Sequence, residues 1–324
     1  MSKIVIGIHG LGNKPPTGLL GKWWKRSLRE GFARLNNPAH FFRFEMVFWA
    51  DILYRKQLDP DIKDKTDPLC ITEPYIPSAT ITKQKPSKIK KKILDLIEKQ
   101  LDNLFLNSDN SVNLSKISDY IIHNYFQDLE IYYSASCVLK KKTDCMGREI
   151  IRERLMKILR KHKRKKILLI AHSMGTIITY DVLSRLPKNI NIDTLITIGS
   201  PLGIPLMMKK IAIEQNLKLD KKNRLHTPDN IRQAWYNFSD LNDKVAFNYN
   251  LGDDYAANSY GIKPRDIIVF NDYKADDIPN PHKSFGYLRT NELSEVVYDF
   301  LNRDVNKVTI WFNRQTAKIL DKIF

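Results

Sequence analysis

Short apolar runs alternate with amphipathic stretches along most of the chain. The apolar runs that we interpret as strands cover residues 3–9, 41–49, 166–172, 233–240 and 266–271. Residues 18–35 and 147–162 instead carry apolar side chains at helical spacing. Strands that are apolar throughout and alternate with amphipathic helices are typical of a parallel sheet covered on both faces. The pattern therefore predicts an α/β protein with a mostly parallel central sheet flanked by helices.

One long stretch in the first half of the chain breaks this alternation. Its first part is rich in proline and shows little periodicity, which is typical of a loop that crosses a surface. Helical spacing returns at 87–105 and 115–140. We expect residues 1–51 and 145–324 to form the core, and residues 52–144 to form a largely helical inserted lid or cap. Such an insertion either shapes a pocket beyond the strand ends or packs away from it.

The most informative local feature is the segment 166–179, in which an apolar strand breaks at Ser173 and a helix follows. The residues two before and two after the serine, Ala171 and Gly175, are both small. A sharp strand-to-helix turn requires this, because its backbone is strained and its flanks pass close together. We expect the turn to expose the Ser173 hydroxyl and to direct the backbone N–H of Met174 toward a reacting oxygen. The sequence thus predicts a nucleophilic serine.

The first predicted strand ends in His9-Gly10-Leu11-Gly12, a His-Gly-x-Gly sequence. A loop of this kind supplies a second backbone donor to a developing oxyanion, here the N–H of Leu11, and its glycines keep side chains away from the substrate carbonyl. An ordinary strand followed by a glycine turn would look the same locally. We take Leu11 and Met174 as the candidate oxyanion-hole donors.

A general base and the acid that orients it are expected after the serine, in the order Ser, Asp, His. His282 lies in the loop after the last predicted strand, and two aspartates, Asp240 and Asp243, follow the strand before it. Val245 can pack onto the sheet and hold the Asp243 carboxylate toward a histidine. Asp240 stands at the strand end, where aspartate commonly caps a loop. The pattern favours Ser173, Asp243 and His282 as a catalytic triad, with Asp240 as the alternative acid.

These segments resemble the α/β-hydrolase superfamily of serine esterases and lipases. The resemblance lies in Ala171-His172-Ser173-Met174-Gly175, in His9-Gly10-Leu11-Gly12, and in the loops of Asp243 and His282. It covers residues 1–50 and 145–304, and it departs from the usual G-x-S-x-G by the single methyl group of Ala171. It implies a mostly parallel sheet, an acyl-serine intermediate, and neither a metal nor an organic cofactor. Residues 197–203 also resemble the part of lipase-like members that borders the substrate cleft.

The remaining histidines and acidic residues form no recognisable metal site. No His or Cys spacing suits zinc, and no glycine-centred acidic loop ending in glutamate suits calcium. We expect His172, beside the serine, to pack under the floor of the site without transferring a proton. We therefore expect no cofactor and no metal.

Charge is a prominent feature of the 324-residue chain, which has 53 basic and 36 acidic residues and a net charge of +17. Basic clusters at 83–92, 140–142 and 160–166 would attract nucleic acid or anionic lipid. None lies in a helix-turn-helix, zinc finger or aromatic RNA-reading strand, so we expect no nucleic-acid partner. The cluster at 83–92 leads into an amphipathic helix, which leaves peripheral contact with an anionic membrane as an alternative to a solvated surface.

Three cysteines without a paired framework favour a reducing compartment. The first strand begins too early for a signal peptide, and no run is long enough to span a membrane. We expect a cytoplasmic protein, of an oligomeric state that the sequence leaves open.

The expected function is hydrolysis of a carboxylic ester, of an acyl lipid or a similar apolar acyl group, through an acyl-Ser173 intermediate. A thioesterase or acyltransferase would use the same residues. The alternative from another class is a protein that keeps the fold without turnover and binds an anionic membrane or a partner.

Overall fold

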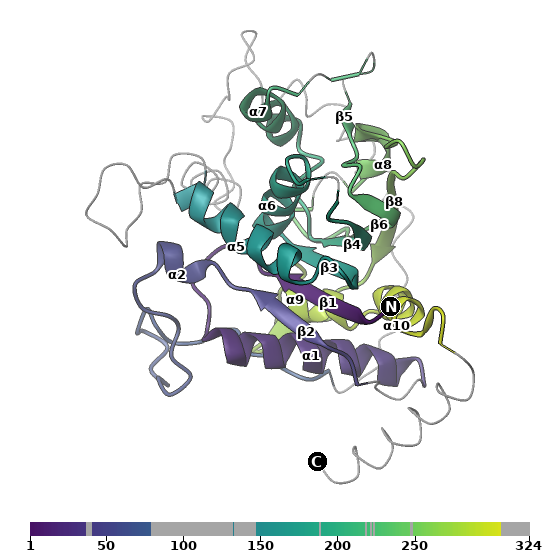
Figure 1. Cartoon of the computed structure of the whole chain (residues 1–324). Helices are drawn as coiled ribbons and strands as arrows, with labels where there is room; N and C mark the ends of the chain where they lie inside the picture. Colours follow the sequence, from purple (N-terminus) through teal and green to yellow (C-terminus); the bar gives the residue numbers. More distant parts are fainter. Residues whose placement is uncertain are drawn as a thin grey trace.

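A six-stranded parallel sheet forms the centre of the protein (Figure 1). The computed structural model describes residues 1–36, 41–78, 132, 147–187, 189–217, 219–220, 222, 224–246 and 249–305. The sheet strands are β1 (Lys3–Ile8), β2 (Phe44–Val47), β3 (Lys166–His172), β4 (Ile192–Ile198), β6 (Ile231–Asp240) and β8 (Pro264–Val269). Their order is β2-β1-β3-β4-β6-β8, and every neighbouring pair is parallel. The prediction of a mostly parallel central sheet is confirmed.

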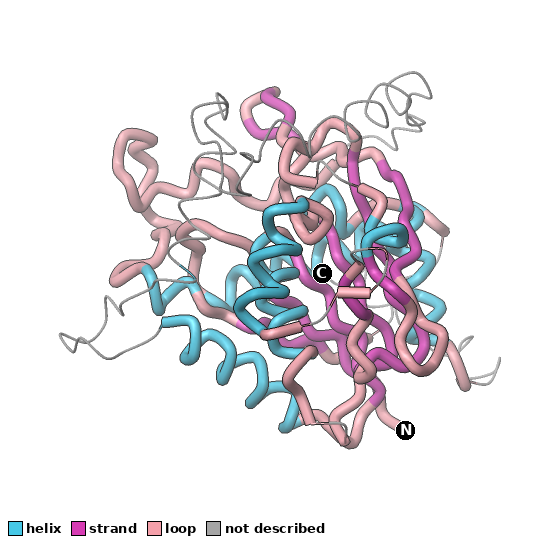
Figure 2. Tube along the Cα trace, turned by 90° about the horizontal axis from the view of Figure 1, so that it is seen from above, coloured by secondary structure: helices cyan, strands magenta, loops and turns pink. Residues whose placement is uncertain are grey.

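Helices cover both faces of this sheet, as seen from above in Figure 2. One face packs against α1 (Thr17–Arg34), α9 (Ser284–Leu288) and α10 (Asn291–Asn302). The other face packs against α5 (Gly147–Lys161), α6 (Met174–Leu183) and α7 (Pro205–Gln215). Alternate residues of a strand point to opposite faces of the sheet. Val5 therefore packs in the core beneath α1, α9 and α10, whereas Ile4 and Ile6 pack in the core beneath α5, α6 and α7. Both faces are buried, which explains why the strands are apolar throughout.

Shorter elements lie outside the main sheet. They are α2 (Ala50–Leu53), β5 (Leu225–His226), α8 (Leu251–Asp254), β7 (Tyr255–Ala256), β9 (Lys274–Ala275) and β10 (Ile278–Pro279). The strands β5 and β7 form a parallel pair, and β9 and β10 form an antiparallel pair.

The stretch predicted as an insertion is described only in part. Residues 54–78 contain no helix or strand longer than a single bridge, in agreement with the predicted loop. The helical spacing at 87–105 and 115–140 lies outside the described residues, except for Tyr132. The end of the loop is fastened to the core, because the Tyr273 hydroxyl donates a hydrogen bond to the Pro74 carbonyl at 2.7 Å.

The strand order creates a topological switch point between β1 and β3. The chain leaves β1 through α1 toward β2 on one side, and leaves β3 through α6 toward β4 on the other. The loops after β1 and β3 therefore diverge, and in open α/β sheets ligands bind in the crevice that this divergence leaves at the carboxyl ends of the strands. The topology alone places a candidate site beside the residues that follow Ile8 and His172.

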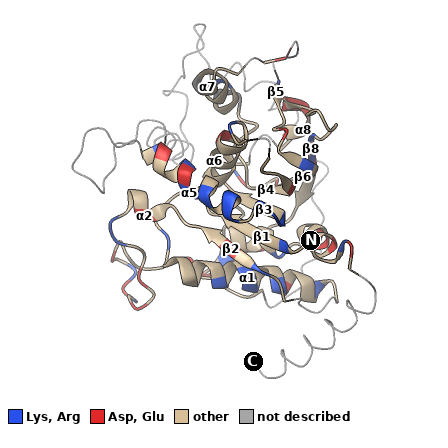
Figure 3. Cartoon of the chain, in the orientation of Figure 1, with Lys and Arg blue, Asp and Glu red and all other residues tan. Residues whose placement is uncertain are grey.

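Lys and Arg residues are distributed over many of the described elements (Figure 3). The cluster at 160–166 spans the end of α5 and the start of β3, where Lys161 pairs with Glu45 and Lys166 with Asp304. The clusters at 83–92 and 140–142 lie outside the described residues. None of the described helices combines the length and the apolar character needed to cross a membrane.

Candidate active site

A single residue joins β3 to α6. Ser173 has φ 54° and ψ −126°, whereas residues with a Cβ atom rarely adopt positive φ. Such a conformation costs on the order of 1–3 kcal/mol and persists only where the surroundings impose it. Here the Ser173 N–H donates to the Ile198 carbonyl at 3.1 Å, and the Thr176 N–H donates to the Ser173 carbonyl at 2.8 Å. The strained turn predicted from the sequence is present.

Two glycines permit the close packing around this turn. A Cβ atom on Gly175 would lie 2.8 Å from the His9 carbonyl oxygen, and one on Gly10 would lie 2.7 Å from the Ser173 Cβ. Any side chain at either position would push the loop after β1 away from the serine. Glycine at positions 10 and 175 is therefore explained by steric contact between the turn and the loop after β1.

Ser173 lies closer to the interior than the sequence suggests. We expected the turn to expose its hydroxyl, but the residue is only 2% exposed. The hydroxyl borders a cavity instead of open solvent. That expectation was wrong because the loops from 9–15, 71–73 and 280–285 surround the turn.

Three of the predicted site residues form a continuous chain of contacts. His282 Nε2 lies 2.9 Å from Ser173 Oγ, and His282 Nδ1 lies 2.9 Å from Asp243 Oδ2 and 3.0 Å from Oδ1. An ionised carboxylate only accepts hydrogen bonds, so Nδ1 carries the proton and donates it to Asp243. Nε2 is then free to accept the hydrogen bond of the serine hydroxyl.

Backbone contacts fix the Asp243 carboxylate. Its side chain is fully buried, and Oδ1 accepts the N–H groups of Val245 at 2.9 Å and Ala246 at 3.3 Å. Gly199 lies against the pair with φ 53°, and a Cβ atom there would be 2.9 Å from Asp243 Oδ2 and 3.1 Å from His282 Nδ1. Only glycine suits this position, since it needs both a positive φ and no side chain.

Asp240 does not reach His282. Its Oδ2 accepts the N–H of Asn271 at 2.6 Å, and its Oδ1 accepts the N–H and the side-chain amide of Asn242 at 2.7 and 2.8 Å. Burial raises the pKa of this carboxyl above its ordinary value. Asp240 thus caps the loops at the ends of β6 and β8, and the structure brings Asp243, not Asp240, to the histidine.

The backbone on both sides of His282 is held by Asn271. Its side-chain amide donates to the carbonyls of Pro281 and Lys283, at 2.8 Å each. Asn280 contributes as well, because its Oδ1 accepts the His282 N–H at 3.0 Å. Since Asp240 in turn accepts the Asn271 N–H, the aspartate that does not touch the histidine still helps to position its loop.

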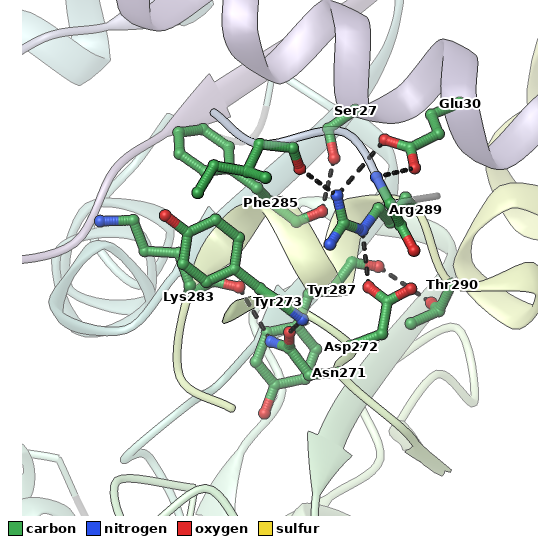
Figure 4. A network of polar contacts seen from close by, with 12 residues as sticks. Ser27, Glu30, Asn271, Asp272, Tyr273, Lys283, Phe285, Tyr287, Arg289 and Thr290 are labelled. Atoms are coloured by element: carbon green, nitrogen blue, oxygen red, sulfur yellow. Dashed lines mark hydrogen bonds and ion pairs between the residues drawn. The ribbon is translucent and has the colours of Figure 1, made fainter. Parts of the chain in front are cut away.

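Figure 4 shows how the segment after His282 is fastened to α1. The Ser27 hydroxyl donates to the Phe285 carbonyl, and the Arg289 guanidinium donates to Asp272, Glu30 and the carbonyl of Ile76. Arg289 is 2% exposed, so these ion pairs are shielded from solvent. The network ties the histidine loop and the end of the 54–78 loop to the same helix.

His172 has a structural contact that the sequence did not indicate. Its Nε2 lies 2.7 Å from the His282 carbonyl oxygen, so this nitrogen carries a proton and donates it. Burial, followed by the proximity of His282, holds the pKa of His172 well below its ordinary value of 6.5. A neutral ring at this position holds the backbone of His282 and is not placed to exchange protons with Ser173.

The loop after β1 is shaped by His9. The Trp49 N–H donates to His9 Nε2 at 3.0 Å, which leaves Nδ1 as the protonated nitrogen, donating to the Gly10 carbonyl at 2.7 Å. Burial, followed by the charge of Lys14, holds the pKa of His9 well below 6.5. Because carbonyl and N–H of a trans peptide point in opposite directions, fixing the Gly10 carbonyl also fixes the direction of the Leu11 N–H.

Both candidate oxyanion donors have an available N–H. Across the described residues, no acceptor lies within hydrogen-bond distance of the Leu11 N–H. Met174 is the first residue of α6, so its N–H has no acceptor within the helix. The Lys14 ammonium donates to the carbonyls of Leu11 and Gly12, which keeps these carbonyls turned toward the lysine.

A cavity of about 440 Å³ opens beside Ser173 and His282. Much of its wall is apolar and comes from Leu20, Trp23, Trp24, Leu58, Ile71 and Phe285. Its charged lining residues are Lys14, Glu73 and Lys283, of which Glu73 and Lys283 form an ion pair at 2.8 Å. The described part of the predicted insertion therefore borders this cavity through Leu58 and residues 71–73.

No protein-family model matches the chain, and no curated protein is significantly similar to it. Within the described ranges, no group of three or more His, Cys, Asp and Glu side chains is arranged to hold a metal ion.

Sequence reasoning missed three residues that shape the site, Gly199, Asn271 and Tyr287. The signal for Gly199 was its place among the small residues of 197–203, and that for Asn271 was its position after a predicted strand. Tyr287, whose hydroxyl contacts Asp243, has no local signal, because the contact spans 44 positions of the chain.

The buried neutral histidines predict how stability depends on pH. The folded-state pKa values of His9 and His172 lie below 6.5, so the unfolded chain binds more protons than the folded one between those values and 6.5. The free energy of unfolding should therefore be highest above pH 6.5 and should fall as the pH decreases from about 7.5 to about 5.5. Urea unfolding across this range, followed by tryptophan fluorescence, measures the slope.

His172→Asn should reduce this slope, since one proton fewer is taken up on unfolding. His226→Asn, at an exposed histidine, is the matched control and should keep the wild-type slope. Equal slopes for wild type and His172→Asn would contradict the assignment of a neutral buried ring.

Proposed function

We propose that this chain is a serine hydrolase of the α/β-hydrolase type, which cleaves a carboxylic ester of an apolar acyl group through an acyl-Ser173 intermediate. The observation that carries the proposal is the chain of hydrogen bonds from Ser173 Oγ through His282 to Asp243. A histidine in this position can remove the serine proton while a buried carboxylate stabilises the resulting imidazolium.

Topology supports the same family. The three residues follow β3, β6 and β8 in the order Ser, Asp, His, and the parallel strands bring their carboxyl ends to one edge of the sheet. The nucleophile follows a strand next to the switch point, beside a His-Gly-x-Gly loop. This combination agrees with the resemblance noted in the sequence.

Acylation follows from the geometry. His282 Nε2 takes the proton of Ser173 Oγ as that oxygen attacks the ester carbonyl carbon, and the carbonyl oxygen becomes an oxyanion. The backbone N–H groups of Leu11 and Met174 would donate to this oxyanion, each lowering the barrier by about 2.7–4 kcal/mol. The imidazolium then gives its proton to the departing alcohol oxygen, and the acyl group remains on the serine.

Deacylation repeats these steps with water. His282 Nε2 removes a proton from a water molecule as the water oxygen attacks the acyl carbon. The serine oxygen leaves and recovers its proton from the imidazolium, and the carboxylic acid is released. A thioester substrate, or an alcohol in place of water, would use the same residues, so the leaving group and acceptor are set by the cavity.

The cavity favours an apolar acyl group. Its volume of about 440 Å³ falls in the usual range of small-molecule sites, roughly 300–1,000 Å³. Leu20, Trp24 and Phe285 supply apolar surface to the cavity that Ser173 borders, while Lys14 and Lys283 are among its polar lining groups. Burial of an acyl chain against such walls stabilises the complex by about 0.8 kcal/mol for each buried CH₂ group.

A fluorophosphonate probe tests the nucleophile. Wild-type protein should be labelled in a stoichiometric and time-dependent manner, because the probe phosphonylates a serine activated by a histidine. Ser173→Ala should remove the label, whereas Ser200→Ala, which changes a buried serine of a neighbouring loop, should retain it. Equal labelling of wild type and Ser173→Ala, read by intact-protein mass spectrometry, would place the reactive serine elsewhere.

The two aspartates should differ strongly in their effect on turnover. Asp243→Asn should lower kcat by about 10⁴-fold, because an amide favours the wrong tautomer of His282. Asp240→Asn should have a far smaller effect, since that side chain caps a loop and reaches the histidine only through Asn271. Hydrolysis of p-nitrophenyl butyrate, with thermal unfolding as a check on folding, gives the comparison. A larger loss in Asp240→Asn than in Asp243→Asn would refute the assignment.

A further inference from the structure

A buried tyrosine also contacts the Asp243 carboxylate. The Tyr287 hydroxyl, on α9, donates to Asp243 Oδ2 at 2.7 Å and accepts the backbone N–H of Asp240 at 2.9 Å. Tyr287 is fully buried, so no solvent competes for these hydrogen bonds. The hydroxyl therefore links the two aspartates that the sequence left as alternatives.

The direction of this hydrogen bond is determined by its partners. A tyrosine hydroxyl has one proton, and the Asp240 N–H already occupies one of its lone pairs. Its proton is consequently aimed at Asp243. Burial, followed by the charge of Asp243, raises the pKa of Tyr287 well above its ordinary value of 10.0, so the hydroxyl keeps its proton at neutral pH.

With this contact, both oxygens of Asp243 have donors besides His282. Oδ1 accepts the N–H groups of Val245 and Ala246, and Oδ2 accepts the Tyr287 hydroxyl. The carboxylate cannot turn without losing hydrogen bonds on both oxygens. Donors to a carboxylate also draw charge from it, which weakens its attraction for the neighbouring imidazolium.

We propose that Tyr287 is a positioning residue of the Ser173–His282–Asp243 site, and that its hydroxyl both fixes the Asp243 carboxylate and limits the basicity of His282. This inference rests on the proposed function, because basicity is read from the pH dependence of ester hydrolysis. A His282 that is too basic would be protonated, and unable to accept the serine proton, over more of the neutral pH range.

Several other charged or titratable groups face His282 or its neighbours. They are Asp240 at the end of β6, His172 at the end of β3, Lys14 in the loop after β1, Glu73 in the 54–78 loop, Lys244 beside Asp243, and Lys283 beside His282. None of these side chains forms a hydrogen bond with the Tyr287 hydroxyl, whose partners are the Asp240 N–H and the Asp243 carboxylate. Burial holds the pKa of His172 well below 6.5, so its ring is neutral at neutral pH. A shift in the pH profile can therefore be attributed to the hydroxyl.

The test compares Tyr287→Phe with Tyr273→Phe. Tyr273 is a suitable control because it is also buried, donates its hydroxyl to a backbone carbonyl, Pro74, and touches none of the three reacting residues. For each protein, kcat and kcat/KM for p-nitrophenyl butyrate, an uncharged ester, are measured as a function of pH. The acid limb is the part of the pH profile in which kcat/KM falls as the pH decreases. Its midpoint reports the pKa of the free enzyme's essential base.

Tyr287→Phe should move the acid limb upward by roughly half a pH unit or more, because the carboxylate charge is less dispersed. It should also lower the plateau of kcat by roughly tenfold, as the carboxylate loses a fixed donor. Tyr273→Phe should leave the position of the acid limb unchanged. Because the free energy of unfolding falls toward acid pH, the rate at each pH is divided by the folded fraction that tryptophan fluorescence gives for the same variant, so the limb position stays informative even if Tyr287→Phe is less stable.

A second substitution guards against loss of the fold. Incorporation of 3-fluorotyrosine at position 287 alone keeps the ring and the hydroxyl but makes the hydroxyl a stronger donor. It should move the acid limb downward, opposite to Tyr287→Phe.

Two outcomes separate failure of the inference from failure of the proposed function. An acid limb at the wild-type position in both Tyr287 variants, with hydrolysis still dependent on Ser173, would overturn the role of Tyr287 alone. Ester hydrolysis that persists in Ser173→Ala would overturn the proposed function, and the inference with it.

Discussion

The candidate site depends on one backbone conformation, the left-handed turn of Ser173 between β3 and α6. β3 is hydrogen-bonded on both sides, to β1 and β4, so its end cannot shift to relieve the strain. The first turn of α6 packs directly on the end of β1 because Gly175 has no side chain. The rigid sheet and the close helix together hold the serine in a conformation that a free peptide would avoid.

The same constraint determines what surrounds the serine. With α6 close to β1, the loop after β1 passes beside the turn, where Gly10 contacts Ser173 and His9 holds the Gly10 peptide. His282 lies in the segment after β8, which is an edge strand of the sheet, so separate contacts must hold it beside the serine. Asn271 and His172 hold the backbone of His282, and the Arg289 network ties its segment to α1. Strain at one residue is thus maintained by packing that extends across the sheet.

Features determined by local sequence could be predicted. Continuous apolar strands and amphipathic helices gave the α/β class, and small residues around Ser173 indicated the turn, because both depend on side chains a few positions apart. Local sequence favoured Asp243 but left Asp240 as an alternative, since the choice depends on how the loop after β6 folds back. Tyr287 and the contact from His172 to His282 were missed, because they join residues far apart in the chain. The expectation that the Ser173 hydroxyl is exposed was wrong for the same reason, because loops far away in the chain enclose it.

The proposed hydrolysis requires a covalent acyl bond to Ser173, and direct observation of that intermediate tests the proposal most closely. Protein mixed with p-nitrophenyl butyrate and quenched in acid during turnover can be digested and analysed by peptide mass spectrometry. We predict one butyryl group, on the peptide that contains Ser173, which disappears once the ester is consumed. Steady hydrolysis with no acyl group on that peptide, or with the acyl group on another residue, would contradict this account.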